Sequence, residues 1–291
     1  MAQKDLIIGA FSNYDEYQVL KPWVQSIHDT GFRGDIVLIA VDAPKPLIDT
    51  LSENGVIVIP VTKQNDMMIH MLRFVYIYDY LNKHVGEYRN VVSTDVRDVI
   101  FQKNPFDHYL MGSDIIASSE AILIKDEPWN RDNIIKNYGE YFYNSVKDKQ
   151  VYNVGILAGT ADHVCDLCFH IYQMSLGRPD WVADQAAYNV LIAHNPWKEF
   201  VYKAGLSEAW AINAHVTNKP DQMEQFSPFL LEGRPRMEDG LVVNEAGVPF
   251  TIVHQYDRVP EWMEYFSKKY GTNITNETKT GSSPKYFTYN T

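Results

Sequence analysis

The segment Asp35–Val41 reads Asp-Ile-Val-Leu-Ile-Ala-Val, an almost unbroken apolar run that predicts a buried strand. Shorter apolar runs at Leu6–Ala10 and Val56–Val61 predict two more strands. Between these runs, Tyr17–Thr30 has apolar residues at helical spacing, and Pro46–Asn54 is a helix-like stretch that ends at a glycine. Because strands that alternate with helices form parallel sheets with right-handed connections, this part of the chain predicts an α/β fold.

The rest of the chain continues in the same way. His70–Asn82 predicts a helix, and Tyr88–Thr94 predicts a buried strand. Later strands are expected at Asp114–Ser118, Val151–Gly159 and Phe250–His254. Later helices are expected, the first of them only in part, at Trp129–Ser145, Thr160–Leu176 and Asp184–His194, with short loop-like elements over Pro196–Gly247.

Composition narrows the class of protein. The chain has 291 residues, of which 45% are hydrophobic and 22% are charged, as in an ordinary globular protein. This length allows one large α/β domain or two small ones. The formal net charge is −11, and no cluster of lysine and arginine stands out, which disfavours a nucleic-acid partner.

Targeting signals and cysteines point to the compartment. The N-terminus has no signal-peptide core, and no run of about 18 apolar residues predicts a membrane span. The two cysteines, Cys165 and Cys168, fall in one expected helix, so we interpret them as a buried face of a reduced, cytoplasmic protein. The polar tail 272–291 is expected to be peripheral, and its glycosylation sequons at Asn273 and Asn276 are interpreted as chance matches.

Two carboxylates, Asp95 and Asp98, follow the expected strand Tyr88–Thr94 and precede another apolar run. Buried carboxylates need a partner, a proton or a metal ion. Ligands of open α/β sheets bind at the carboxyl ends of strands, and paired carboxylates can hold a hard divalent cation. The pair therefore predicts a metal-held phosphate of a nucleotide-type substrate. The competing interpretation is an ion-paired turn in which Arg97 is the partner.

The segment Asp95–Phe106 resembles the region around the DxD motif of the GT-A glycosyltransferases. In that family the aspartates hold Mn²⁺ or Mg²⁺ against the diphosphate of a nucleotide sugar. This chain departs from the motif because Asp-Val-Arg-Asp is one residue longer than DxD. The resemblance leaves open whether Asp95 or Asp98 ligates the metal directly while the other acts through water or orients ribose.

A late histidine extends the resemblance. His254 ends the last expected strand, where many GT-A enzymes supply a third metal ligand, and an imidazole beside carboxylates suits Mn²⁺. Arg258, four residues later, is placed to reach a phosphate. The alternative is that His254 is a structural residue.

The strand with Asn153 and Gly155 resembles the Asn-x-Gly strand that lines the sugar pocket of retaining GT-A enzymes. An amide side chain both donates to and accepts from hydroxyl groups, and glycine lets a ligand approach the backbone. The alternative is a buried strand with a bulge. Asp184 and Gln185 resemble the Asp-Gln pair of the same enzymes, which implies that Asp184 binds donor-sugar hydroxyls and that Gln185 lies near the anomeric carbon.

Asp184 has two further interpretations. It stands at the start of an expected helix, where an aspartate also serves as an N-cap. In an inverting enzyme it would be the general base for the acceptor hydroxyl.

Other residues of the resemblance bind the donor. Arg73, on the helix before the metal strand, is expected to pair with a metal-binding aspartate or a phosphate, unless it is simply an exposed helix charge. Asp42, after the second strand, is a candidate for contact with the base. The loop that resembles the base- and ribose-binding segment consists of Phe11, Ser12, Asn13 and Tyr14.

The resemblance implies a single large GT-A domain over 1–271, with a mixed, mainly parallel sheet flanked by helices. Its nucleotide-binding half would span about 1–110 and its sugar and acceptor half about 111–271. The implied activity is metal-dependent transfer of a sugar from a UDP- or GDP-type donor to a hydroxyl of a glycan or other acceptor, and retention is favoured over inversion. The alternatives are a sugar-1-phosphate nucleotidyltransferase, against which the N-terminal loop lacks glycine-rich and basic character, and a non-catalytic binding module.

Overall fold

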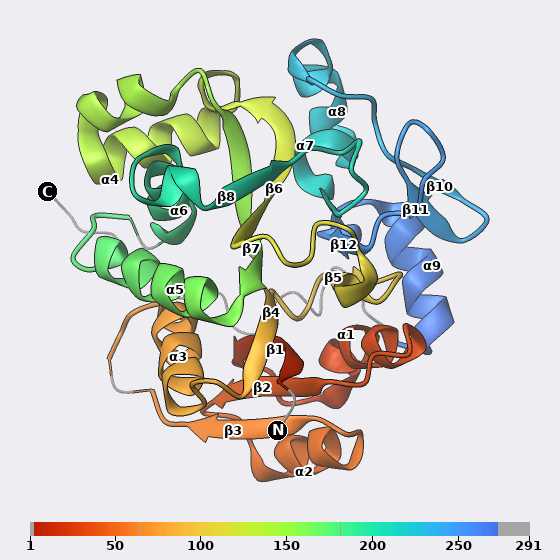
Figure 1. Ribbon diagram of the computed structural model, residues 1–291. Coiled ribbons are helices and arrows are strands. Elements are labelled where there is room, and N and C mark those ends of the chain that lie inside the picture. The colour runs from red at the N-terminus through yellow and green to blue at the C-terminus, as the bar shows by residue number, and fades with distance from the viewer. Residues whose placement is uncertain (1–2, 64, 181, 273–291) are drawn as a thin grey trace, which may run out of the picture.

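The computed structural model describes residues 3–63, 65–180 and 182–272 of the 291. A seven-stranded sheet of order β3-β2-β1-β4-β7-β6-β8 runs through the molecule (Figure 1). Its strands are β1 (Lys4–Ser12), β2 (Asp35–Val41), β3 (Ile57–Val61), β4 (Tyr88–Thr94), β6 (Ile115–Leu123), β7 (Gln150–Thr160) and β8 (Val201–Ala204). The pairs β1–β2, β2–β3, β1–β4 and β6–β8 are parallel, whereas β7 is antiparallel to both neighbours. The expected single α/β domain with a mixed, mainly parallel sheet is confirmed.

Helices cover both faces of this sheet. They are α1 (Tyr17–Asp29), α2 (Lys45–Glu53), α3 (Ile69–Lys83), α4 (Pro128–Val146), α5 (Ala161–Ser175) and α6 (Asp184–Ala193). Side chains of successive strand residues point to opposite faces, so Leu6 packs in one core with α3, α5 and α6, and Ile7 packs in another with α1 and α2. In Figure 1, α3 and α5 lie on the left of the sheet and α1 lies on the right.

A small three-stranded sheet of order β5-β12-β9 carries part of the candidate site. Its strands are β5 (Val99–Phe101), β12 (Ile252–His254) and β9 (Ala211–Asn213). β12 is antiparallel to β5, which places His254 opposite Val99, and parallel to β9, which places His254 beside Asn213. Because β5 follows β4 directly, this register brings His254 to the end of β4.

The remaining elements lie in the C-terminal part. α7 (Ala214–Asn218), α8 (Pro220–Phe226) and the hairpin of β10 (Arg236–Glu238) with β11 (Leu241–Val243) are short, as expected for that segment. A last helix, α9 (Pro260–Tyr270), was not predicted. No helix in the described ranges is long and apolar enough to cross a membrane. The expected tail and its two sequons lie outside the described residues, apart from Thr272.

Several expected strands differ from the structure at their ends, and the differences in β6 and β12 have an identifiable cause. β6 continues five residues past the expected end at Ser118, to Leu123. The register shift in its pairing with β7 lets the chain continue, and Ser119 binds the Gln150 side chain there. β12 begins at Ile252 rather than Phe250, because Phe250 donates its backbone N–H to Val242 instead of joining the ladder.

Candidate metal centre and adjoining cavities

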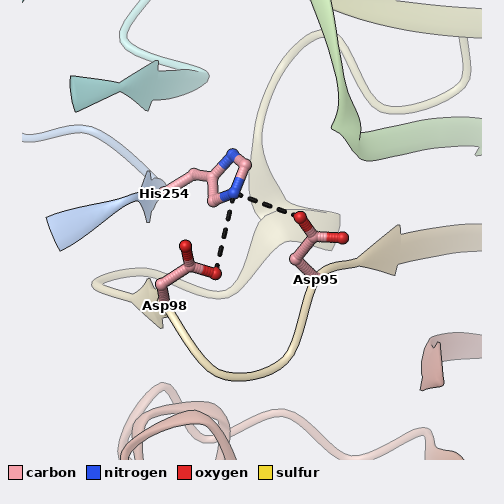
Figure 2. A group of neighbouring side chains, drawn as sticks. All are labelled: Asp95, Asp98 and His254. Atoms are coloured by element: carbon pink, nitrogen blue, oxygen red, sulfur yellow. Dashed lines mark ion pairs between the residues drawn. The ribbon is translucent and has the colours of Figure 1, made fainter. Parts of the chain in front are cut away.

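Asp95, Asp98 and His254 converge at the end of β4 (Figure 2). The two aspartates lie on the turn between β4 and β5, and the histidine reaches them from the end of β12. Nε2 of His254 lies 3.3 Å from Oδ2 of Asp95 and 3.8 Å from Oδ1 of Asp98. One ligand atom from each residue lies within 4.8 Å of the others, so the group could hold a metal ion.

The second oxygen of each aspartate faces an arginine. Oδ1 of Asp95 forms an ion pair with Arg73. Oδ2 of Asp98 lies 3.4 Å from Nη2 of Arg97 and 3.7 Å from Nη2 of Arg258. Each carboxylate is therefore oriented by a guanidinium group on one side and presents its other oxygen to the imidazole, as expected of partners that orient metal ligands.

The imidazole of His254 is suited to bind a cation. Its Nδ1 lies 2.9 Å from the side-chain oxygen of Asn213, and because an amide oxygen only accepts, Nδ1 carries the proton. The lone pair is then on Nε2, between the carboxylates. Burial lowers the pKa of His254, which keeps the ring neutral. Burial acts to raise the pKa of Asp98, but neighbouring positive charges, Arg97 and Arg258 among them, outweigh it and hold that pKa below its usual value. Two carboxylates and a neutral imidazole are a donor set for a divalent cation.

A cavity of about 270 Å³ opens beside the three residues. Its wall combines the end of β1, the start of α3 and the turn after β4. The expected site residues that line it are Phe11, Ser12, Tyr14, Arg73, Asp95, Asp98, His254 and Arg258. Two other expected residues, Asn13 and Asp42, are exposed and do not belong to the described part of this wall. The Asp42 carboxylate instead accepts the backbone N–H of Lys63. The structure therefore brings together most of the expected donor-binding residues and leaves these two aside.

A second cavity, of about 260 Å³, adjoins the first, because Gln255 and Arg258 line both. Asn153 and Gln185 from the sequence prediction line its wall. Residues that the sequence did not single out for this site complete it, namely Glu120, Glu127, Asn130, His215 and Val216, together with the half-exposed Trp129. Glu127 is occupied in capping α4, where it accepts the backbone N–H groups of Trp129 and Asn130.

Glu120 is the main residue that sequence reasoning missed. Its Oε1 accepts hydrogen bonds from Nδ2 of Asn153, at 2.7 Å, and Nε2 of Gln185, at 3.2 Å. Burial, with the charge of Glu127 adding to it, raises the pKa of Glu120 to about 7. The available signal was the position of Glu120 between the apolar runs 115–117 and 121–124, because a buried carboxylate is almost always paired.

Asp184 lies behind Arg73 rather than in either cavity wall. It is 3% exposed and forms an ion pair of 3.2 Å with Nη2 of Arg73. The N-cap interpretation is wrong, since Ala183 is the N-cap of α6 and makes no side-chain cap. Arg73 is likewise not an exposed helix charge, because it is 7% exposed and bridges Asp95 and Asp184. Asp184 is placed to orient Arg73.

Gly155 keeps the turn after β4 against β7. Its carbonyl accepts the backbone N–H of Asp95 at 2.8 Å, and its own N–H donates to the Asn153 side chain at 2.8 Å. A Cβ at this position would lie 2.9 Å from Oδ2 of Asp95 and closer still to the His254 ring. The observed positions of Asp95 and His254 therefore require a glycine here.

Larger cavities occur elsewhere. One of about 700 Å³ is lined by segments that include Leu206, Glu232 and Glu245. The Glu232 carboxylate there accepts the backbone N–H groups of Leu206 and Ser207, so it holds a loop in place. The 270 Å³ cavity is smaller, but it is the one beside the candidate metal ligands.

No protein-family model matches the chain, and no curated protein matches it. The fold and the site define an α/β protein with a candidate metal centre in the wall of one polar cavity that adjoins a second.

Proposed function

We propose that this protein is a metal-dependent glycosyltransferase of GT-A type, which moves a sugar from a nucleoside diphosphate sugar to a hydroxyl acceptor. The observation that carries the proposal is the position of Asp95, Asp98 and His254 in the wall of one polar cavity that adjoins a second. One cavity would take the nucleotide and the other the reacting sugar and hydroxyl, with the diphosphate at the centre. The Asp-Val-Arg-Asp resemblance and the late histidine support the same assignment.

The first cavity suits a nucleotide because of its place in the sheet. In the strand order β3-β2-β1-β4, the direction of strand succession reverses between β1 and β4. Doubly wound sheets bind ligands in the crevice at the carboxyl ends of the two strands that flank such a reversal. Tyr14, after β1, is partly exposed and stacks on the buried Phe11 with ring centroids 6.1 Å apart, and the Tyr14 ring offers a face for a nucleobase.

A bound Mn²⁺ or Mg²⁺ would act as a Lewis acid that offsets negative charge on the leaving diphosphate. Arg258 lies at the junction of the cavities, where it can bind a phosphoryl oxygen. In the second cavity Asn153 and Gln185 present amide groups for sugar hydroxyls, although both already donate to Glu120. Retention is favoured by the resemblance of these two residues; Asp184 would serve the reaction by orienting Arg73 rather than as a base.

A thermal-shift panel tests the donor assignment. UDP-, GDP- and dTDP-sugars are screened with Mn²⁺ and with EDTA, and one nucleotide class should raise Tm only when the metal is present. Asp98→Asn should abolish the metal-dependent shift, whereas Asp49→Asn, in an exposed helical ion pair, should retain it. The proposal fails if no nucleotide sugar shifts Tm in Mn²⁺.

A product assay separates the proposal from its rivals. A glycosyltransferase that slowly hydrolyses its donor releases nucleoside diphosphate in Mn²⁺. A nucleotidyltransferase would instead release pyrophosphate from a nucleoside triphosphate and a sugar 1-phosphate, and a binding module would release neither product.

A further inference from the structure

Asp257 is a buried carboxylate that contacts two arginines of the first cavity. Its side chain is 1% exposed. Oδ2 accepts from Nη1 of Arg97 at 2.7 Å, and both oxygens lie 2.9 Å from Nη1 of Arg258. One carboxylate therefore holds the two guanidinium groups on the same side of the site.

The other ends of these arginines are held loosely. Nη2 of Arg97 and Nη2 of Arg258 lie 3.4 and 3.7 Å from Oδ2 of Asp98, longer than a good charged hydrogen bond. Both side chains line the cavity and are 18% and 26% exposed. Two positive groups this close would repel each other, and Asp257 offsets that repulsion while its own contacts leave the Nη2 groups facing Asp98 at these longer distances.

We propose that Asp257 is a positioning residue that makes Arg97 and Arg258 a paired guanidinium receptor for the oxygens of a diphosphate. The inference rests on the proposed function for the identity of the natural ligand. The inference assigns a role to Arg97, the additional residue of Asp-Val-Arg-Asp relative to DxD. The receptor faces Oδ2 of Asp98, whereas the candidate metal ligand is Oδ1, so the arginines bind phosphoryl oxygens in addition to any metal.

The direction in which Asp257→Asn changes the affinity for phosphate distinguishes a positioning role from a simple effect of charge. Asp257→Asn removes a negative charge close to the anion, so charge alone predicts tighter binding of a phosphate. Positioning predicts weaker binding, because an amide no longer fixes both guanidinium groups. The probe is inorganic pyrophosphate, titrated by calorimetry into the full chain in EDTA, which tests the receptor without metal, sugar or base.

We expect wild-type protein to bind pyrophosphate and Asp257→Asn to bind it at least about fivefold more weakly. The matched control is Glu261→Gln, an exposed carboxylate nearby in the sequence, which should bind within about twofold of wild type. If Asp257→Asn does not fold, Arg97→Lys tests the same point, since it keeps the charge but loses the fork, and it too should weaken binding about fivefold.

The inference is overturned if wild type does not bind pyrophosphate in EDTA, or if Asp257→Asn binds it as tightly as wild type or more tightly. If Asp257→Asn is unfolded, unchanged binding by Arg97→Lys overturns it. Failure of the proposed function is distinguishable. In that case the pyrophosphate differences remain while no nucleotide sugar raises Tm in Mn²⁺.

Discussion

Nδ1 of His254 lies 2.9 Å from the side-chain oxygen of Asn213, its neighbour on the parallel strand β9. This contact fixes the proton on Nδ1 and directs the Nε2 lone pair at the two aspartates. Partners that orient a metal-ligating histidine change metal affinity by about 10- to 100-fold when removed.

We therefore expect Asn213→Ala to weaken Mn²⁺ binding by about 10-fold or more, measured from free Mn²⁺ by electron paramagnetic resonance. Asn144→Ala, on the exposed end of α4, should leave the affinity unchanged. Equal Mn²⁺ affinity in Asn213→Ala and wild type would show that the contact does not orient a ligand.

Arg73 stabilises two carboxylates, Asp95 and Asp184, from a position that is 7% exposed. Removing one partner of a buried ion pair leaves uncompensated charge, so Arg73→Met should lower the free energy of unfolding by about 3–5 kcal/mol at pH 7. Arg89→Met, in an exposed pair with Asp5, should cost less than about 1 kcal/mol. Urea unfolding measures both variants, and similar losses in the two would contradict the buried role of Arg73.

Gly155 gives a steric test of the candidate metal centre. In Gly155→Ala the new Cβ must displace the Asp95 carboxylate or the His254 ring, so Mn²⁺ binding should be lost and stability should fall by about 1–3 kcal/mol. Gly86→Ala is the control, since no atom lies within 4 Å of its Cβ and only its φ of +79° is strained. It should lose stability but keep Mn²⁺ binding; if Gly155→Ala binds Mn²⁺ equally well, the ligand assignment is wrong.

The sequence predicted strands well where a continuous apolar run is sufficient to mark a buried strand. The apolar run Asp35–Val41 is β2 with the same bounds, because a strand buried on both faces needs no partner-specific residue. The helix α9 also left a local signal that was overlooked, with a proline at its start and aromatic residues at Trp262, Phe266 and Tyr270, four residues apart.

Local patterns could not supply the partners in the site. Asp95 and Asp98 were recognisable as a pair, but their arrangement with His254 depends on the register of β12 against β5. Glu120 falls beyond the expected strand end at Ser118, and its role depends on Asn153 and Gln185, which come from other elements. Asp257 was equally inconspicuous, since its role depends on arginines that only the fold brings together.

Glu120 should make stability depend on pH. Burial raises its pKa to about 7, above the usual value for a carboxyl, so between about pH 5 and pH 7 the folded state binds more protons than the unfolded state. The free energy of unfolding must then fall as pH rises through this range. In Glu120→Gln the side chain does not titrate, so this fall in the free energy of unfolding should be absent.

The free energy of unfolding of Glu120→Gln minus that of wild type should therefore become more positive from pH 5 to pH 7.5, by up to about 3 kcal/mol. Urea unfolding at several pH values measures this difference, in which the other titrating groups largely cancel. Glu224→Gln, an exposed carboxylate on α8, should show no such trend. A difference for Glu120→Gln that does not change with pH would mean that Glu120 is already ionised at pH 5, and that its amide partners offset its burial.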